Sequence, residues 1–313
     1  MDMSDHATWL PHEIHRHEAD VPASAAGLID YLRANPIDDL LVEKKALIFR
    51  GFGVTEQTLP EVMDILLPNR LAYVHGNSPR TKVGNNIYTS TEYPPELTIS
   101  MHNELSYSHQ WPSRLLFFCA EAPATGGATP VVDGVRWLEA LDDEVREAYA
   151  GGVTYTQNLH DGYGLGKSWQ DTFETDDRGA VEEFLTGTGA EFRWNANGIQ
   201  VSMTRPSFTR HPVTGAEVWF NQSDQWHPAS LGDETAAELA RLLPEDELPQ
   251  SVRFANGDPI PAEYALQVRD RGIEEAKDCD WREGDLMLID NVLVGHGRRS
   301  FTGKRRILVA MSD

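Results

Sequence analysis

The sequence predicts a mainly β protein whose core is a sandwich or barrel carrying helical insertions. Strand-like runs are short and scattered, two strongly apolar runs stand near the end of the chain, and helical patterns lie between the strands without regular β-α-β alternation. A doubly wound parallel sheet would require that alternation. No internal repeat, low-complexity tract or long linker divides the 313 residues. We therefore expect a single domain over residues 1–313, with elaborated loops.

Each predicted strand is an apolar run bounded by a turn signal. The first ends at Gly51, and a later one follows the turn-like sequence HPVTG at residues 211–215. The predicted strands are residues 46–50, 115–119, 217–220, 285–289 and 306–310. The last two are apolar almost throughout, so we expect them to be core strands.

Three helices are expected between these strands. From Val135 to Tyr149 apolar residues recur at a spacing of three to four, and two glycines follow as a stop. The other predicted helices cover residues 235–243, which end before a proline, and residues 262–276. The insertions near 135–200 and 225–280 hold these helices, and we expect them to act as lids over a site.

Charge and composition restrict the possible partners and compartment. A net charge of −22 disfavours nucleic acid and anionic membranes, although a local basic patch near Arg298 and Arg299 could receive a carrier protein. Cys119 and Cys279 are expected to be plain thiols. No apolar run is long enough to cross a bilayer, and no secretory leader is recognisable. We expect a cytoplasmic protein without a membrane span.

The sequence MHNELSY at residues 101–107 places two strong metal ligands two residues apart. In an extended segment, His102 and Glu104 would point to the same side and present an imidazole and a carboxylate to one point. Because a single His-x-Glu pair is common by chance, a third ligand is needed. His296 is the candidate: it follows an apolar strand, and its flanking glycines would let the backbone approach a bound ion or ligand.

Two histidines and one carboxylate form the facial triad of non-haem Fe(II) oxygenases, which leaves three positions of an octahedral ion open. The same ligands can hold zinc in a hydrolase, but the helical string His-Glu-x-x-His is absent. If the oxygenase used 2-oxoglutarate, the distal carboxylate would need a fixed cation and a hydroxyl. Arg306 and Thr129 are the candidates, with Arg305 as the fallback on the opposite face. A zinc hydrolase has no need of that pair, and a binding module has no need of three intact ligands.

These residues lie within a larger set of ordered motifs: FRGF (49–52), YTSTEYP (88–94), HNELSY (102–107), GGATP (126–130), HPVTG (211–215), WFNQ (219–222), DN (290–291), HGR (296–298) and RRI (305–307). With them, most of the chain resembles the TauD/TfdA superfamily of Fe(II)- and 2-oxoglutarate-dependent dioxygenases. Within that superfamily it is similar to the clavaminate-synthase-like or SyrP-like branch of natural-product pathways.

The resemblance implies a double-stranded β-helix, or jelly roll, with iron at one open end between two sheets. It implies His102, Glu104 and His296 as iron ligands, with Arg306 and Thr129 at the distal carboxylate of 2-oxoglutarate. The expected cofactors are Fe(II), 2-oxoglutarate and O₂. The expected reaction is hydroxylation of an unactivated C–H bond in an amino acid or amino-acid-derived natural-product intermediate, free or carrier-tethered. Desaturation, epoxidation and oxidative cyclisation are alternative outcomes that begin with the same cofactors and the same first reaction steps.

Details of the resemblance narrow the range of expected reactions and substrates. Related halogenases have a small residue where Glu104 stands, so halogenation is disfavoured. Taurine-type members have an arginine four residues past the 2-oxoglutarate arginine, and Ala310 stands there. The candidates for substrate contact are Tyr107, Arg205, Asn221 and Gln222. For the last two, the alternative is that their side chains satisfy local backbone groups.

Overall fold

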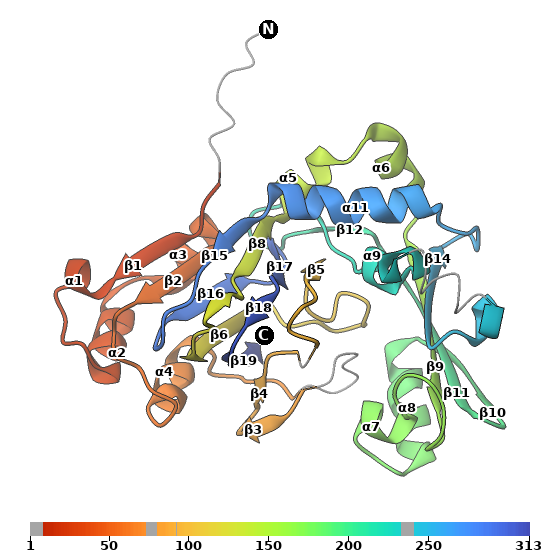
Figure 1. The fold of residues 1–313 in the computed structure, drawn as a ribbon, viewed down its shortest axis with the longest axis horizontal. Coiled ribbons are helices and arrows are strands. Elements are labelled where there is room, and N and C mark those ends of the chain that lie inside the picture. The colour runs from red at the N-terminus through yellow and green to blue at the C-terminus, as the bar shows by residue number, and fades with distance from the viewer. Residues whose placement is uncertain (1–8, 73–79, 92, 233–240) are drawn as a thin grey trace, which may run out of the picture.

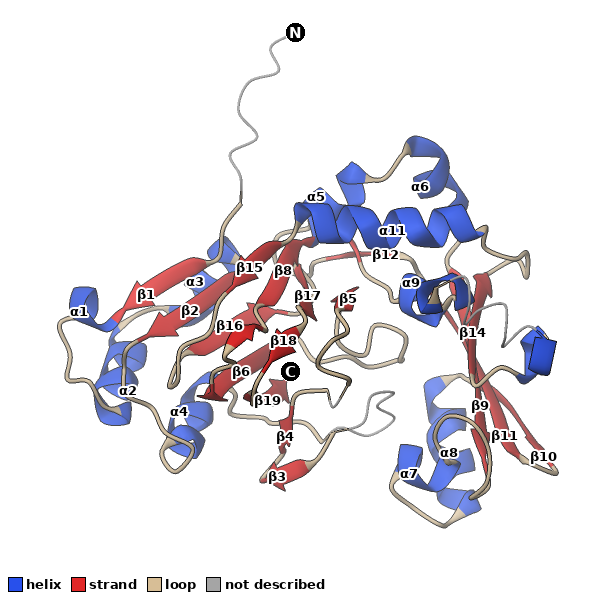
Figure 2. Cartoon of the chain, viewed as in Figure 1, coloured by secondary structure: helices blue, strands red, loops and turns tan. Residues whose placement is uncertain are grey.

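The computed structural model describes residues 9–72, 80–91, 93–232 and 241–313. Strands run through the middle of the molecule, and most helices lie at its edges (Figures 1 and 2). No described helix is long and apolar enough to cross a membrane.

A large sheet forms one half of the core. Its strands, in spatial order, are β1 (His12–His15), β2 (Ala46–Arg50), β16 (Leu286–Asp290), β6 (Arg114–Glu121), β19 (Arg306–Ser312), β4 (Ile87–Thr89) and β3 (Lys82–Gly84). Only the β1–β2 pair is parallel among these described strands. The predicted strands at 46–50, 115–119, 285–289 and 306–310 are thus confirmed, and they lie side by side in this sheet.

One face of the large sheet is covered by N-terminal helices (Figure 1). They are α2 (Ala25–Ala34), α3 (Ile37–Lys44) and α4 (Leu59–Leu66), preceded by the short α1 (Arg16–Ala19). Alternation along β19 divides its side chains between two cores: Leu308 and Ala310 pack with the helices, whereas Ile307 and Val309 belong to the core on the other face. This alternation also separates the neighbouring residues Arg305 and Arg306.

A smaller sheet packs on that other face. Its order is β15 (Lys277–Cys279), β8 (Thr129–Asp133), β17 (Val294–Arg298) and β5 (Ile99–His102). Met101, Val131 and Val294 from this sheet share one hydrophobic cluster with Phe117 and Val309 from the large sheet. The two facing sheets form the expected jelly-roll core. A two-stranded ribbon of β7 (Thr125–Gly126) and β18 (Phe301–Thr302) lies beside them.

The two expected insertions meet in one further sheet. Its order is β10 (Glu191–Asn195), β11 (Gly198–Arg205), β9 (Val153–His160) and β14 (Gln250–Phe254). Strand β14 comes from the second insertion and pairs with β9 from the first. Helices α7 (Trp169–Phe173) and α8 (Arg178–Thr188) add a separate apolar cluster to this sheet. The predicted strand at 217–220 is β13 (Glu217–Trp219), which pairs with β12 (Phe208–Arg210) instead.

The helix predictions need one correction. The helix expected from Val135 to Tyr149 is two helices, α5 (Gly134–Ala140) and α6 (Asp143–Tyr149), because Leu141 and Asp142 have extended backbone between them. Aspartate favours the position just before a helix, but the Asp142 carboxylate makes no capping bond here and instead accepts from Gln267 Nε2 at 2.9 Å. The helix predicted at 262–276 is confirmed as α11 (Ala262–Glu275), which packs on α5.

The helix predicted at 235–243 falls mainly on residues 233–240, outside the described residues. The remaining described helices are the short α9 (Ser223–Trp226), η1 (Pro228–Leu231) and η2 (Glu245–Glu247).

Candidate metal centre

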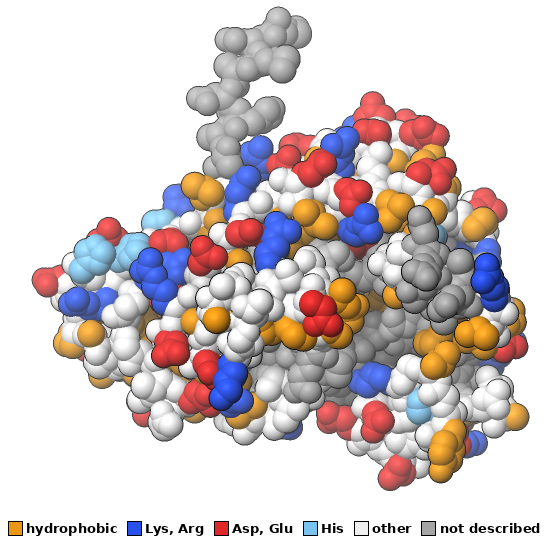
Figure 3. Space-filling model, viewed as in Figure 1, with side chains coloured by type: hydrophobic (Ala, Val, Ile, Leu, Met, Phe, Trp, Pro, Cys, Tyr) orange, Lys and Arg blue, Asp and Glu red, His pale blue; other side chains and the backbone are white. Residues whose placement is uncertain are grey.

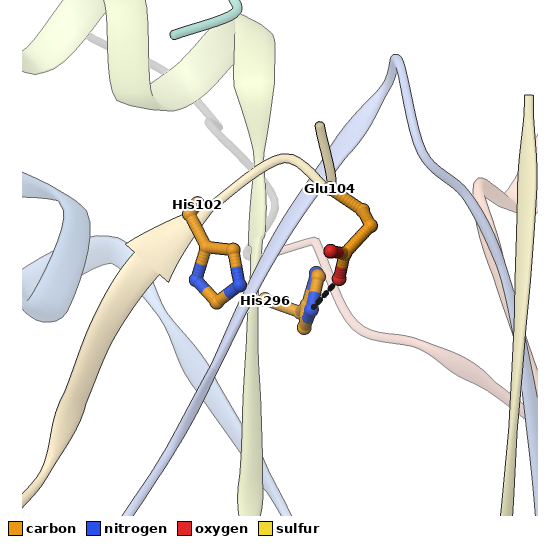
Figure 4. Close-up of side chains that lie close together, drawn as sticks. All are labelled: His102, Glu104 and His296. Carbon is orange, nitrogen blue, oxygen red and sulfur yellow. Dashed lines mark ion pairs between the residues drawn. The ribbon is translucent and has the colours of Figure 1, made fainter. Parts of the chain in front are cut away.

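Strand pairing in the smaller sheet brings the two histidines together. His102, the last residue of β5, is directly opposite His296 in the β5–β17 register. Their ring centroids are 4.3 Å apart, and the ring of Phe117 lies 5.1 Å from that of His296. With Glu104 they offer ligand atoms that all lie within 4.8 Å of one another (Figure 4). Two imidazoles and one carboxylate at this spacing fit an Fe(II) ion with an open face.

A turn, and not strand alternation, directs Glu104 toward the histidines. Strand β5 ends at His102, and Leu105 has a left-handed φ of 56°. The backbone of Glu104 is held by the Asn291 side chain, which accepts from its N–H at 2.8 Å and donates to its C=O at 3.0 Å. The expectation of an extended His-x-Glu segment is therefore corrected, because a buried amide clamp fixes the carboxylate beyond the strand.

The electrostatic environment keeps both imidazoles neutral. Burial lowers the pKa of His102, against the opposing effect of the Glu104 charge. Burial also lowers the pKa of His296 well below its ordinary value, and the neighbouring His102 and Arg80 side chains lower it further. His102 Nδ1 lies 3.0 Å from the carbonyl oxygen of Ser100 and 3.1 Å from the amide nitrogen of Gln225, which itself donates to that carbonyl at 3.0 Å. Because the carbonyl can only accept, it favours a proton on Nδ1, which leaves the lone pair of Nε2 for a metal ion.

The glycines beside His296 serve strand packing. A Cβ on Gly295 would meet the Trp137 ring at 3.0 Å, and one on Gly297 would meet the Ile99 carbonyl oxygen at 2.6 Å. They let a tryptophan and strand β5 approach β17, which sets the position of His296. Gly297 also lines the cavity beside the histidines, so the expectation that a flanking glycine lies against a ligand is corrected only for Gly295.

A cavity beside the two histidines contains the cation and the hydroxyl that a dicarboxylate would need. Arg305 and Thr129 line it, together with apolar side chains from both sheets: Ile99, Phe117, Ile307 and Val309. Arg305 Nη2 lies 3.3 Å from Thr129 Oγ1, and Trp281 Nε1 donates to the same oxygen at 2.9 Å. Because Thr129 Oγ1 accepts from these two groups, its own proton is available to a ligand. Burial lowers the pKa of Arg305 to about 10, so the guanidinium is still charged at neutral pH.

The expectation for Arg306 is corrected. Its guanidinium pairs with both carboxylate oxygens of Glu56, at 2.8 and 2.9 Å, on the helix-covered side of β19. Arg306 does not line the cavity, whereas Arg305 shares the inward face with Ile307 and Val309. The fallback residue is therefore the one that meets Thr129. Counted from Arg305, the position of the taurine-type arginine is Val309, which is again uncharged.

The candidate substrate residues divide into two groups. Asn221 donates to the Ser207 carbonyl at 3.0 Å and accepts from the Ser223 N–H at 2.9 Å, and Gln222 donates to the Asn103 carbonyl at 2.7 Å. These two side chains satisfy backbone groups around the site, which corrects the expectation that they contact substrate.

Tyr107 is buried, with its ring centroid 5.1 Å from that of Trp226. Arg205, at the end of β11, stacks over the Trp111 ring at 5.1 Å. Among the described residues, Arg205 Nε is buried without a hydrogen-bond partner.

The basic stretch near the C-terminus is not a free patch. Arg298 is buried and donates to the carbonyls of Tyr93, Pro94 and Leu97 at 2.8, 2.6 and 2.8 Å, while Arg299 pairs with Asp278. On the face shown in Figure 3, basic and acidic side chains are interspersed. The expectation that this stretch receives a carrier protein loses its basis.

Sequence reasoning missed three residues of the site: Arg80, Asn291 as a clamp, and Trp281. Arg80 Nη2 donates to Glu104 Oε2 at 2.6 Å, and both side chains are at most 5% exposed. No local pattern marks Arg80 or Trp281. Asn291 did carry a signal, since it is a polar residue directly after a fully buried strand and five residues before His296.

Comparisons with known proteins agree with this geometry. Residues 17–311 match the family described as "Taurine catabolism dioxygenase TauD, TfdA family". The chain is 34% identical to the dapdiamide synthesis protein DdaC of Enterobacter agglomerans, over 93% of this chain and 88% of that protein. It is 30% identical to a clavaminate synthase-like protein of Arabidopsis thaliana, over 88% of this chain and 83% of that protein.

Solved structures share the fold at low identity. The PvcB protein of Pseudomonas aeruginosa has a TM-score of 0.51 and 15% identity, covering 97% of this chain and 86% of its own. A taurine dioxygenase of Burkholderia xenovorans has a TM-score of 0.51 and 13% identity, covering 90% and 80%. These matches set aside the hydrolase and binding-module alternatives: the chain belongs to the TauD/TfdA family and is an Fe(II)- and 2-oxoglutarate-dependent dioxygenase.

Proposed function

We propose that His102, Glu104 and His296 hold the Fe(II) ion and that Arg305 and Thr129 bind the distal carboxylate of 2-oxoglutarate. The convergence of the three ligand atoms within 4.8 Å, beside a cavity lined by Arg305 and Thr129, carries this proposal. Arginine suits a carboxylate because its planar fork can donate two parallel hydrogen bonds. When bound, Fe(II) supplies the oxidative decarboxylation of 2-oxoglutarate that is coupled to removal of hydrogen from the substrate.

The protein's own residues prepare and protect this chemistry. Neutral imidazoles leave their lone pairs for the ion, and Asn291 holds the Glu104 loop in place. The apolar side chains of Phe117, Ile307 and Val309 keep bulk water from the cavity wall. In such a dry cavity the ion pair between Arg305 and a carboxylate is stronger than it would be in water.

The substrate we propose is an amino acid or an amino-acid-derived intermediate of a natural-product pathway, free or carrier-tethered, and hydroxylation is the proposed ending. The name of the relative DdaC, a dapdiamide synthesis protein, supports a biosynthetic role. Arg205 supports a substrate with a carboxylate, because this half-buried cation stacks on Trp111 and its Nε has no hydrogen-bond partner in the described structure. We assign Arg205 as the proposed carboxylate anchor and keep Tyr107, whose ring packs against Tyr155 and Trp226, as a further proposed substrate contact.

Incubation of the Fe(II)-loaded protein with 2-oxoglutarate, O₂ and candidate amino acids, followed by mass spectrometry, tests this function. Hydroxylation adds one oxygen atom, whereas desaturation or cyclisation removes two hydrogens; epoxidation of an alkene also adds one oxygen and is distinguished by NMR. Arg205→Ala should raise KM for a carboxylate-bearing substrate while leaving 2-oxoglutarate binding unchanged. Arg210→Ala is the matched control, since Arg210 lies on an exposed surface and pairs with Glu217. Equal KM values in the two variants would refute the role of Arg205.

A further inference from the structure

The buried ion pair between Arg80 and Glu104 has a consequence for the metal centre. We propose that Arg80 is a positioning residue: its guanidinium holds Glu104 Oε2, which lies 3.8 Å from His296 Nε2, and so fixes the rotation of the carboxylate such that Glu104 binds the ion through this single oxygen. This inference rests on the proposed ligand set of His102, Glu104 and His296. It concerns how many positions of the ion stay open for 2-oxoglutarate and O₂.

The geometry gives Arg80 direct control of the carboxylate. Arg80 Nη2 donates to Glu104 Oε2 at 2.6 Å, with side chains that are 4% and 5% exposed. Arg80 also lines the same cavity as His102 and His296. A charge-assisted hydrogen bond in such a buried place is strong and is not displaced by solvent.

The backbone and the carboxylate of Glu104 are held by different groups. Asn291 fixes the backbone through hydrogen bonds to both the N–H and the C=O of Glu104. The torsions that remain are those of the Glu104 side chain, and the last of them, about the bond to the carboxylate, is soft. Arg80 therefore controls the rotation of the carboxylate and not the position of the loop.

The rotation of the carboxylate decides how many coordination positions of the ion remain open for other ligands. Two imidazoles and one carboxylate oxygen leave three positions of an octahedral ion open, two for the chelating end of 2-oxoglutarate and one for O₂. A carboxylate that turned to bind through both oxygens would occupy one of the three. By holding one oxygen of the carboxylate, Arg80 keeps all three of these positions open.

The other two arginines of the cavity are engaged elsewhere. Arg298 donates to three backbone carbonyls of residues 93–97, and Arg305 donates to the Gly127 carbonyl at 2.9 Å and lies beside Thr129. Among the cavity arginines of the described structure, Arg80 is thus the one that donates a hydrogen bond to a proposed metal ligand.

Counting the water molecules on a bound Mn(II) ion tests the proposal without turnover. The count comes from the electron-nuclear double resonance of exchangeable protons in Mn(II)-loaded protein before 2-oxoglutarate is added. We expect about three waters in the parent protein, because a facial triad leaves three positions of an octahedral ion open, and about two in Arg80→Met, where the second carboxylate oxygen would take one of them. The dissociation constant of 2-oxoglutarate should rise about 10- to 100-fold in Arg80→Met, the usual effect of losing a group that orients a ligand.

Two controls make the result specific. Arg80→Lys keeps one charged donor and should retain the parent water count, and Arg306→Ala removes an arginine on the other face of β19 and should change neither quantity. An unchanged count and affinity in Arg80→Met would overturn the proposal, as would a folded Arg80→Met that no longer binds Mn(II). If Arg80→Met does not fold, the parent count decides: two waters overturn the role of Arg80. A parent protein that binds no Mn(II) refutes the proposed ligand set instead.

Discussion

Replacing Arg305 by alanine should weaken 2-oxoglutarate binding, whereas replacing its neighbour Arg306 should not. Arg305, the residue immediately before β19, faces the cavity with Ile307 and Val309 and lies 3.3 Å from Thr129 Oγ1. Arg306 is on the opposite face and pairs with Glu56. The two variants remove the same charge from adjacent positions, so any difference between them comes from the side of the strand on which the charge stands.

The size of the effect follows from the burial of Arg305. A hydrogen bond to a charged group contributes about 1.5–3 kcal/mol, and each 1.4 kcal/mol is a factor of ten in a dissociation constant. Arg305→Ala should therefore weaken 2-oxoglutarate binding about 10- to 150-fold. The Arg306–Glu56 pair is partly exposed, at 39% and 36%, so its loss should reduce the free energy of unfolding by no more than about 1 kcal/mol.

Calorimetric titration of the Mn(II)-loaded variants with 2-oxoglutarate measures the dissociation constant of each without turnover. Thermal unfolding of each variant, followed by circular dichroism, checks that the fold is kept. A larger loss of affinity in Arg306→Ala than in Arg305→Ala would refute the assignment. Equal affinities in parent and Arg305→Ala would refute the view that this cavity holds the distal carboxylate.

Further predictions concern the supports of the site. Asn291→Ala removes the clamp on Glu104 and should lower metal affinity about 10- to 100-fold, measured by competition with a chelating dye; parent-like affinity would show that the loop holds itself. Burial raises the pKa of Asp224 to about 7, so the folded protein keeps a proton that the unfolded chain releases near pH 4. Stability should fall as pH rises from about 4 to about 7, by a few kcal/mol at most, and denaturant unfolding at pH 5 and 8 should show a smaller fall in Asp224→Asn. Gly297→Ala should destabilise the fold because its Cβ would meet a β5 carbonyl at 2.6 Å, whereas Gly187→Ala, with open space in α8, should stabilise it by about 0.5–1 kcal/mol; the reverse order of melting temperatures would contradict the packing.

The local sequence pattern was sufficient to predict the core strands and to single out two histidines and a glutamate as the candidate metal ligands. An apolar run such as residues 285–289 is expected to be buried, and the histidine that follows it lies in β17, an inner strand of the smaller sheet, opposite His102. The side on which Arg305 and Arg306 point was harder to predict. It depends on which face of β19 meets the helices, and this is a tertiary property absent from the local sequence.

Residues that act through long-range contacts also escaped prediction. Arg80 and Glu104 are 24 residues apart, and Asn291 reaches Glu104 across 187 residues. Asn221 and Gln222 are in a segment that the resemblance places near the iron, which made them candidates for substrate contact, but their partners are backbone groups that only the fold brings near. The split between α5 and α6 was signalled by Asp142, whose preference for a helix start competed with an apolar spacing that continued past it.

The most direct test of the metal centre is an anaerobic titration of the parent protein and His296→Ala with Fe(II) and 2-oxoglutarate, followed by visible absorption. The parent should develop the weak metal-to-ligand charge-transfer band of chelated 2-oxoglutarate. His296→Ala should not, while His15→Ala, which changes a histidine of β1 in the sheet's outer strand, should behave as the parent does. A band of parent intensity in His296→Ala, or no band in an iron-loaded parent, would contradict the ligand set.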